Sequence, residues 1–373
     1  PLQARVDLGR LLYFDPVLSG DMDVSCGHCH HPAFAWADGR ALGAGVTGSG
    51  LGPERDLSDP TVGETPRNSP AVLDAAFNGS HDPDAPPWLG SMFWEGRVQG
   101  LESQARRPIR SRDEMAHDAY PASMALPTVM ARLQSIPEYV DRFVAAFPQE
   151  AGALPPDRRR EIIDSDTYAR AVAAYEREIY SADAPFDRFV RGEDAALDAA
   201  PRRGLEIFFA AGCADCHHGP MFSDFRFHAL GVKQAGPGKP PIHERGDGSD
   251  RGRFLVEPIP ANDYAFRTPT LRNLPLTAPY FHTGGKDYPQ GGYDTIEGAI
   301  GFFNRGCNDE GLPQEVLEPM APLGLDEGQV ADLAAFLRSL TGTRLGSPLL
   351  DPTVPARVPS GLEPPEAREP ALR

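Results

Sequence analysis

The sequence is poor in cysteine, in basic residues and in long apolar runs, and each shortage excludes a class of protein. Five cysteines among 373 residues is an odd number, which argues against a closed disulfide framework. Thirty-six basic and 53 acidic residues give a net charge of −17, which disfavours nucleic acid and anionic membrane surfaces as partners. No apolar run approaches the roughly 20 residues of a membrane helix, so we expect no membrane span. The chain opens at Pro1 without a signal-peptide pattern, which we interpret as a processed or truncated form.

Four of the five cysteines fall into two C-x-x-C-H pentads, at residues 26–30 and 213–217. Two cysteines at this spacing can reach the two vinyl groups of one haem, and the adjoining histidine then lies under the iron as its proximal ligand. A zinc site would leave both histidines unexplained, and a thioredoxin-like pair would need a βαβ pattern that is absent. We therefore predict two covalently bound haems c, attached through Cys26, Cys29 and His30 and through Cys213, Cys216 and His217. The remaining thiol, Cys307, we interpret as buried or inert.

The spacing of apolar residues predicts a mainly α protein. Helices are expected over residues 126–147, 166–179 and 325–340, and a further one over 201–209 that leads into the second pentad. Gly 38 and Pro 39 predict long ordered loops and few short strands.

Each pentad has about a domain's length of chain. We expect two cytochrome c-like domains, 1–155 and 156–345, followed by a Pro-rich extended tail, 346–373.

Several further blocks keep one order along the chain. The blocks are Leu8-Gly9-Arg10, Arg67-Asn68-Ser69-Pro70, Phe93-Trp94-Glu95-Gly96-Arg97, Arg267-Thr268-Pro269-Thr270-Leu271-Arg272-Asn273 and Thr277-Ala278-Pro279-Tyr280-Phe281-His282. Together with the first pentad they resemble the bacterial diheme cytochrome c peroxidases and the related MauG-type enzymes, from about residue 8 to 342.

The resemblance implies roles for individual residues. The haem ligated by His30 should react with hydrogen peroxide, and the haem ligated by His217 should store and relay electrons. Trp94 matches a tryptophan between the two haems. Gln104, Pro108 and Glu114 match the distal pocket, where a carboxylate takes a proton from peroxide and returns it to the leaving oxygen.

The resemblance also implies a calcium ion between the domains. Asn68 would supply a side-chain oxygen, and Thr277 and Pro279 would supply backbone carbonyls, which are hard ligands that suit Ca²⁺.

The sequence departs from the peroxidase pattern at three places. The loop Ser58–Pro66 holds no histidine, where typical peroxidases carry one that blocks the peroxidatic iron, so we expect an open site as in the MauG type. Phe303 stands where the family has an axial methionine or tyrosine. Tyr288, Tyr293 and Met320 are then the alternative sixth ligands of the second haem, and the site can also be five-coordinate. Ala211 replaces the surface tryptophan through which MauG oxidises its protein substrate, which argues against the same partner.

The resemblance therefore implies a MauG-like enzyme that uses hydrogen peroxide to form high-valent haem iron and oxidises tryptophan or tyrosine of a partner protein. One alternative is a cytochrome c peroxidase that reduces peroxide with electrons from a small cytochrome or cupredoxin. Another is a diheme electron-transfer protein without turnover. Because haem is attached to C-x-x-C-H pentads outside the bacterial inner membrane, we expect a periplasmic protein.

Overall fold

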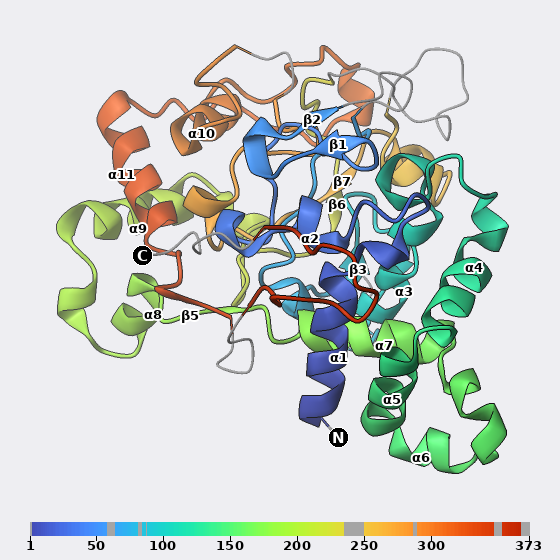
Figure 1. Cartoon of the computed structure of the whole chain (residues 1–373). Coiled ribbons are helices and arrows are strands. Elements are labelled where there is room, and N and C mark those ends of the chain that lie inside the picture. Colours follow the sequence, from blue (N-terminus) through green and yellow to red (C-terminus); the bar gives the residue numbers. More distant parts are fainter. Residues whose placement is uncertain are drawn as a thin grey trace.

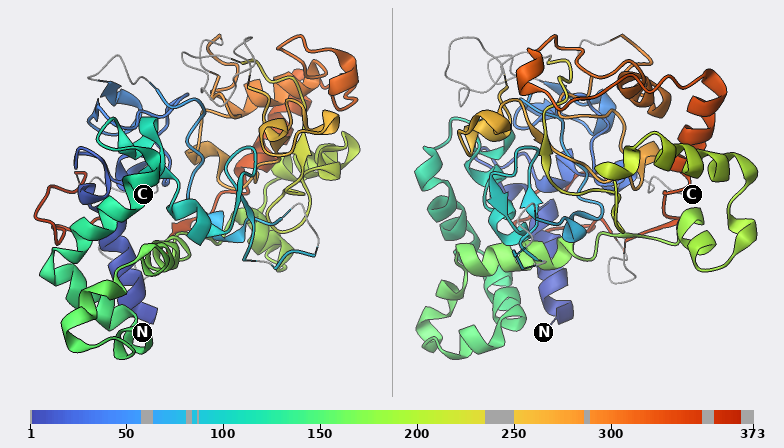
Figure 2. Two further views of the ribbon diagram at one scale, coloured as in Figure 1. Left: turned by 90° about the vertical axis from the view of Figure 1, so that its right-hand side faces the viewer. Right: turned by 180° about the vertical axis from the view of Figure 1, so that it is seen from behind.

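The computed structural model describes residues 2–57, 64–80, 84–86, 88–234, 250–285, 289–346 and 353–366. Two groups of helices lie side by side in it, one from each half of the chain (Figures 1 and 2). The first group contains α1 (Leu2–Phe14), α2 (Cys26–Cys29), α3 (Leu101–Ala105), α4 (Ala122–Gln134), α5 (Pro137–Ala146), α6 (Pro148–Gly152) and α7 (Ser165–Glu176). The second contains α8 (Pro185–Val190), α9 (Ala199–Ala210), α10 (Ile296–Asn304) and α11 (Glu327–Arg338).

Strands are short and form only two-residue antiparallel pairs in the described part of the chain. The pairs are β1 (Gly48–Ser49) with β2 (Asp56–Leu57), β3 (Ser91–Met92) with β4 (Val98–Gln99), β5 (Ser181–Ala182) with β8 (Arg344–Leu345), and β6 (Phe227–His228) with β7 (Phe266–Arg267). The prediction of a mainly α fold with few short strands is confirmed.

Each group is built around one closely packed helix pair. In the first, α1 packs against α7, and a methyl group on Gly9 would lie 1.9 Å from the carbonyl oxygen of Ala171. In the second, α9 packs against α11, and a methyl group on Gly204 would lie 2.0 Å from the carbonyl oxygen of Asp332. Any side chain at either glycine would push the two backbones apart, so both helix pairs depend on the missing Cβ.

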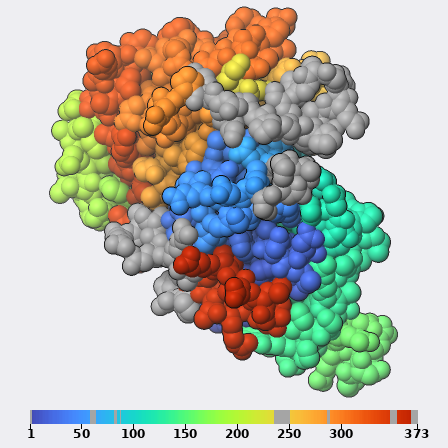
Figure 3. All heavy atoms as spheres, turned by 45° about the horizontal axis from the view of Figure 1, so that its top comes forward, coloured from blue at the N-terminus to red at the C-terminus, as the bar shows by residue number. Residues whose placement is uncertain are grey.

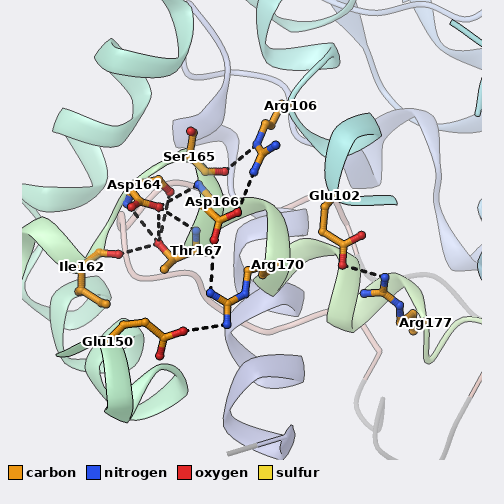
Figure 4. Close-up of polar contacts among 10 residues, drawn as sticks. All are labelled: Glu102, Arg106, Glu150, Ile162, Asp164, Ser165, Asp166, Thr167, Arg170 and Arg177. Atoms are coloured by element: carbon orange, nitrogen blue, oxygen red, sulfur yellow. Dashed lines mark hydrogen bonds and ion pairs between the residues drawn. The ribbon is translucent and has the colours of Figure 1, made fainter. Parts of the chain in front are cut away.

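Helix α7 is anchored at its start and along its exposed side. Asp164 caps the helix by accepting hydrogen bonds from the backbone N–H groups of Asp166 and Thr167, both at 2.8 Å. Arg106 of the segment after α3 donates to the Ser165 carbonyl at 2.9 Å, and Arg170 contacts Glu150 and Asp166 (Figure 4). The boundary predicted at 155/156 stays a prediction, and α7, which follows it, packs in the same core as α1.

The predicted helices are found with shifted bounds. The segment 126–147 forms two helices rather than one, because α4 begins at Ala122 and ends at Gln134, and α5 then starts at Pro137. The predicted helices 166–179, 201–209 and 325–340 correspond to α7, α9 and α11.

The described part of the tail, 353–366, contains no helix or strand, yet it is firmly docked. It returns to the first helix group and lies over it, as the red segment in Figure 3. The Ser360 hydroxyl donates to the fully buried carboxylate of Asp15 at 2.6 Å. Because His31 Nδ1 accepts from a backbone N–H, its Nε2–H donates to the Glu366 carbonyl at 3.0 Å. We call residues 353–366 the strap.

Candidate haem and peroxide site

The first pentad forms the short helix α2 and is held by the first helix group. The His30 N–H donates to the Cys26 carbonyl at 2.9 Å, and the Tyr13 hydroxyl of α1 donates to the His30 carbonyl at 3.0 Å. Arg55, which is 1% exposed, donates to the Cys29 sulfur at 3.2 Å. Burial lowers the pKa of His30 to about 4, so the ring is neutral at pH 7, which is the form that binds a metal.

The second pentad follows α9 directly. The His217 N–H donates to the Cys213 carbonyl at 2.9 Å. The other end of the residue is fixed by a 2.8 Å contact between His217 Nδ1 and the Phe222 carbonyl, which requires the proton on Nδ1. Nε2 therefore carries the lone pair that an iron ligand needs. Burial also lowers the pKa of His217, which keeps the ring neutral.

A buried arginine supports the fit to haem. Arg267 of β7 is 8% exposed, and its Nε and Nη1 have no hydrogen-bond partner among the described residues. Burial lowers the pKa of its guanidinium to about 10. A buried cation needs an anion, and a haem carries two propionates. The cysteine pairs, the neutral histidines and this guanidinium are together a donor set that fits haem c.

Trp94 lies where the two halves of the chain meet. Its indole N–H donates to the Asn68 carbonyl at 2.9 Å, and its own carbonyl accepts from the Arg267 N–H at 2.8 Å. Its ring lies edge-on to His282, with 6.4 Å between ring centroids, and His282 stacks on Phe266 at 3.6 Å. The tryptophan therefore contacts segments from both halves of the chain, and its role as a path between two haems stays a prediction.

The three predicted distal residues lie close together in sequence and in three short elements. Gln104 is in α3, Pro108 begins the one-turn helix η5 (Pro108–Arg110), and Glu114 is in the π-helical turn η6 (Arg112–Ala116). Single π-turns are frequent at functional sites. The Glu114 side chain is 29% exposed and lies 3.9 Å from Arg97 Nη2. Burial raises the pKa of Glu114, and Arg97 opposes that rise.

Glu114 is close to the first pentad. Its charge contributes to raising the pKa of both Cys26 and Cys29, after the larger effect of burial. The fold therefore brings the predicted proton-transfer carboxylate and the predicted peroxidatic haem site together. Arg97 and Arg267 lie in blocks that carry the family resemblance, and Arg55 lies outside them. The sequence assigned none of the three a role in the site, because the partners of an arginine depend on tertiary structure.

The three predicted calcium ligands come from segments that touch. The Asn68 N–H donates to the His282 carbonyl at 2.8 Å, which ties residue 68 to the segment that contains Thr277 and Pro279. The Asn68 side-chain N–H donates to the Arg40 carbonyl at 2.9 Å. This orientation leaves the amide oxygen as the atom offered to a cation, the donor type that Ca²⁺ prefers.

The alternative sixth ligands of the second haem differ in burial and in hydrogen bonding. The Tyr293 hydroxyl is buried and donates to Asp309 at 2.8 Å. Met320 is 38% exposed, and Glu318 nearby contacts His228 Nδ1 at 3.2 Å. Tyr288 lies outside the described residues. Phe303 lies beside Phe281, with 6.3 Å between ring centroids.

A charged histidine lies beside the second pentad. His228 Nε2 is 2.9 Å from Asp224, and the hydrogen bonds to Asp224 and then to Cys216 raise the pKa of His228 to about 10. Side-chain atoms of Cys216, Asp224 and His228 lie within 4.8 Å of one another. Because Cys216 is predicted to form a thioether, which is a weak ligand, we interpret this group as a histidine whose protonated form is favoured by Asp224 rather than as a metal site.

Comparison with known proteins agrees with this geometry. The family model described as "Di-haem cytochrome c peroxidase" matches residues 3–195, about half of the chain. The chain belongs to the di-haem cytochrome c peroxidase family. It is 33% identical to the methylamine utilization protein MauG of Methylorubrum extorquens over 90% of this chain and 78% of that protein. It is 36% identical to the cytochrome c551 peroxidase of Pseudomonas aeruginosa over 74% of this chain and 67% of that protein.

Solved structures of the di-haem family have the same fold. A MauG-like protein associated with microbial copper homeostasis matches with a TM-score of 0.68 and 26% identity, over 91% of this chain and 89% of that one. The diheme peroxidase BthA of Burkholderia thailandensis matches with a TM-score of 0.66 and 22% identity, over 91% and 86% of the two chains.

Membership of the di-haem family makes the protein a peroxide-dependent oxidoreductase with two haems c, as predicted. Members of this family act on peroxide together with a protein partner. None of the described helices is long and apolar enough to cross a membrane.

Proposed function

We propose that the protein is a MauG-like enzyme of the periplasm that uses hydrogen peroxide to oxidise tryptophan or tyrosine side chains of a partner protein. The observation that carries the proposal is the absence of histidine from the sequence segment 58–66, where a peroxidase would carry the residue that blocks its peroxidatic iron. Residues 58–63 lie outside the described part, so the support here comes from sequence. The 33% identity to MauG over 90% of the chain agrees with it.

Haem iron, when bound at the first pentad, supplies the centre at which peroxide is coordinated and reduced. The chain's part is proton transfer. Reduction of one peroxide to two waters consumes two electrons and two protons, and heterolysis of the O–O bond is faster when a proton reaches the leaving oxygen so that it departs as water. Glu114, as a carboxylate, is placed to accept a proton from the incoming peroxide and return it to the leaving oxygen. Gln104 and Pro108 would shape the space around it.

Two electrons must then come from the partner. Trp94 contacts both halves of the chain, which supports a role as the electron path from the second haem site to the first. The partner's aromatic residues lose those two electrons. Because Ala211 replaces the surface tryptophan of MauG, we propose a partner and docking point of a different kind. Calcium held by Asn68, Thr277 and Pro279 would fix the meeting point of the two halves.

Reduction of peroxide with electrons from a small cytochrome or cupredoxin is the second candidate. The 36% identity to cytochrome c551 peroxidase favours it. The two functions differ in whether the oxidised protein reacts with peroxide before any electron has been supplied.

The test is to mix the fully oxidised holoprotein with one equivalent of hydrogen peroxide and to record visible and near-infrared spectra. We expect a rapid spectral change without prior reduction. Reaction only after one-electron reduction would transfer the assignment to the cytochrome c peroxidases. No reaction in either state would leave an electron carrier.

A matched pair of variants tests the role of the carboxylate. Glu114→Gln should slow the peroxide reaction by about 10² to 10⁴-fold with unchanged haem content. Asp113→Asn removes the same charge from the neighbouring residue of η6 and should react like the wild type at pH values above the acid limb, where Glu114 is ionised in both proteins. Equal rates for the two variants would contradict the role given to Glu114.

A further inference from the structure

Arg97 is held in one orientation by two contacts, one at an edge and one at a face of its guanidinium. Its Nη1 donates to Glu95 Oε1 at 2.5 Å, and its Cζ lies 3.4 Å from the centroid of the Phe93 ring. All three residues belong to the turn between β3 and β4. A carboxylate together with an aromatic face leaves an arginine little rotational freedom, so the direction of Nη2 is fixed.

The free edge of this guanidinium faces Glu114. Nη2 lies 3.9 Å from Glu114 Oε1, and the two side chains are about equally exposed, 31% and 29%. The turn η6 that carries Glu114 is fixed as well, because the Gly20 N–H donates to the Met115 carbonyl at 2.7 Å. Arg97 is therefore fixed by neighbouring side chains, and Glu114 is carried by a fixed turn.

Two acidic side chains act on Glu114. Asp113 of the same turn and Glu95 both oppose its ionisation. Burial acts in the same direction and is the largest effect. Arg97 is the cation that opposes them.

The network continues away from the site. The second oxygen of Glu95 pairs with Arg67, and Arg67 forms a two-pronged pair with Asp250, at 2.6 and 2.8 Å. Arg253 donates to the carbonyls of Glu95 and Gly96 at 3.1 and 2.9 Å. Glu95 is 2% exposed. Its carboxylate, which holds Arg97, is linked through Arg67 to Asp250 in the second half of the chain.

We propose that Arg97 is a positioning residue for Glu114: fixed by Phe93 and Glu95, it holds the Glu114 carboxylate in its charged form and in place for proton transfer. The inference deepens the proposed function and rests on it. Glu95 then acts on the pKa of Glu114 in the opposite direction to Arg97, because its charge partly neutralises the arginine that it orients.

Two variants of the holoprotein test this through the pH dependence of the peroxide reaction rate. Arg97→Gln removes the cation, so the acid limb of the pH profile should move to higher pH by about one unit, with a roughly tenfold lower rate below the limb. Glu95→Gln leaves Arg97 charged and releases it from its neutralising partner, so the limb should move to lower pH. Arg142→Gln is the control, because Arg142 of α5 pairs with Glu138 of the same helix at 2.7 Å and should leave the limb unchanged.

The opposite directions separate a charge effect from damage to the fold, which would move both limbs the same way or neither. Acid limbs that coincide with the wild type in both variants, or that shift in one common direction, would overturn the inference. Glu114→Gln distinguishes failure of the proposed function from failure of the inference about Arg97. If it leaves the rate unchanged, the proposed function fails. If it slows the reaction while Arg97→Gln leaves the limb in place, the inference about Arg97 fails alone.

Discussion

Replacing Arg267 with methionine should destabilise the haem-loaded protein, although the same change removes a buried charge that has no ion-pair partner among the described residues. Burial lowers the pKa of this arginine from 12.5 to about 10, which corresponds to about 3 kcal/mol against the charged form at neutral pH. This penalty is fully present below pH 10 and disappears as the pH rises toward 12.5. A haem propionate that pairs with the guanidinium would offset it. Removing Arg267 then leaves the propionate buried and unpaired, at about 3 to 5 kcal/mol.

The sign of the stability change therefore decides whether the arginine holds a propionate. Denaturant unfolding of the holoprotein, followed at the haem absorption band, should show a lower midpoint for Arg267→Met. Arg267→Lys keeps the charge and should fall between that variant and the wild type. A higher midpoint for Arg267→Met, equivalent to about 3 kcal/mol of added stability, would show that the charge is unpaired in the holoprotein and would refute the reasoning.

Four further predictions follow from the described contacts. Ser360→Ala removes a hydrogen bond to the buried Asp15 carboxylate and should lower the free energy of unfolding by about 2 kcal/mol, and an unchanged denaturant midpoint would contradict this. Burial raises the pKa of Glu176 to about 8, so stability should fall as the pH rises from 4.5 through 8, and Glu176→Gln should abolish that fall in a pH series of melting temperatures. Trp94→Phe should leave the peroxide reaction at the first haem intact but slow oxidation of the partner, measured as loss of the partner's aromatic residues; equal rates would place the electron path elsewhere. Chelation of calcium should change the haem spectra of the wild type but not those of Asn68→Ala, and identical responses would argue against the site.

Signals confined to a few neighbouring residues predicted the structure well. The pentads are complete in five residues each, and α11 carries its own start signal, because Asp326 and Gln329 cap each other's backbone N–H groups. The break between α4 and α5 was missed, although Pro137 marks it. A proline favours the first turn of a helix and disfavours its interior.

Features that depend on contacts between distant residues could not be found in the sequence. The close approach at Gly9 and Gly204 requires knowing which helix lies opposite. The orientation of Arg97 depends on Glu95, which is itself held by Arg67. The strap has little apolar periodicity, yet Val358 is 1% exposed within it, because its binding surface is formed by residues more than 200 positions earlier.

The strap gives the protein an order of assembly. A methyl group on Gly27 would lie 3.1 Å from Pro365, so the docked strap lies directly on the helix whose two thiols must be joined to haem. Its main attachment points, Asp15 and His31, precede it by 345 and 335 residues, and Asp15 is also held by Tyr139 at 2.6 Å. Both attachment points are therefore brought together by the fold of the N-terminal half, and we expect the strap to dock after that half has folded. We expect haem attachment to come first and the strap to close afterwards, so that its docking marks a mature molecule.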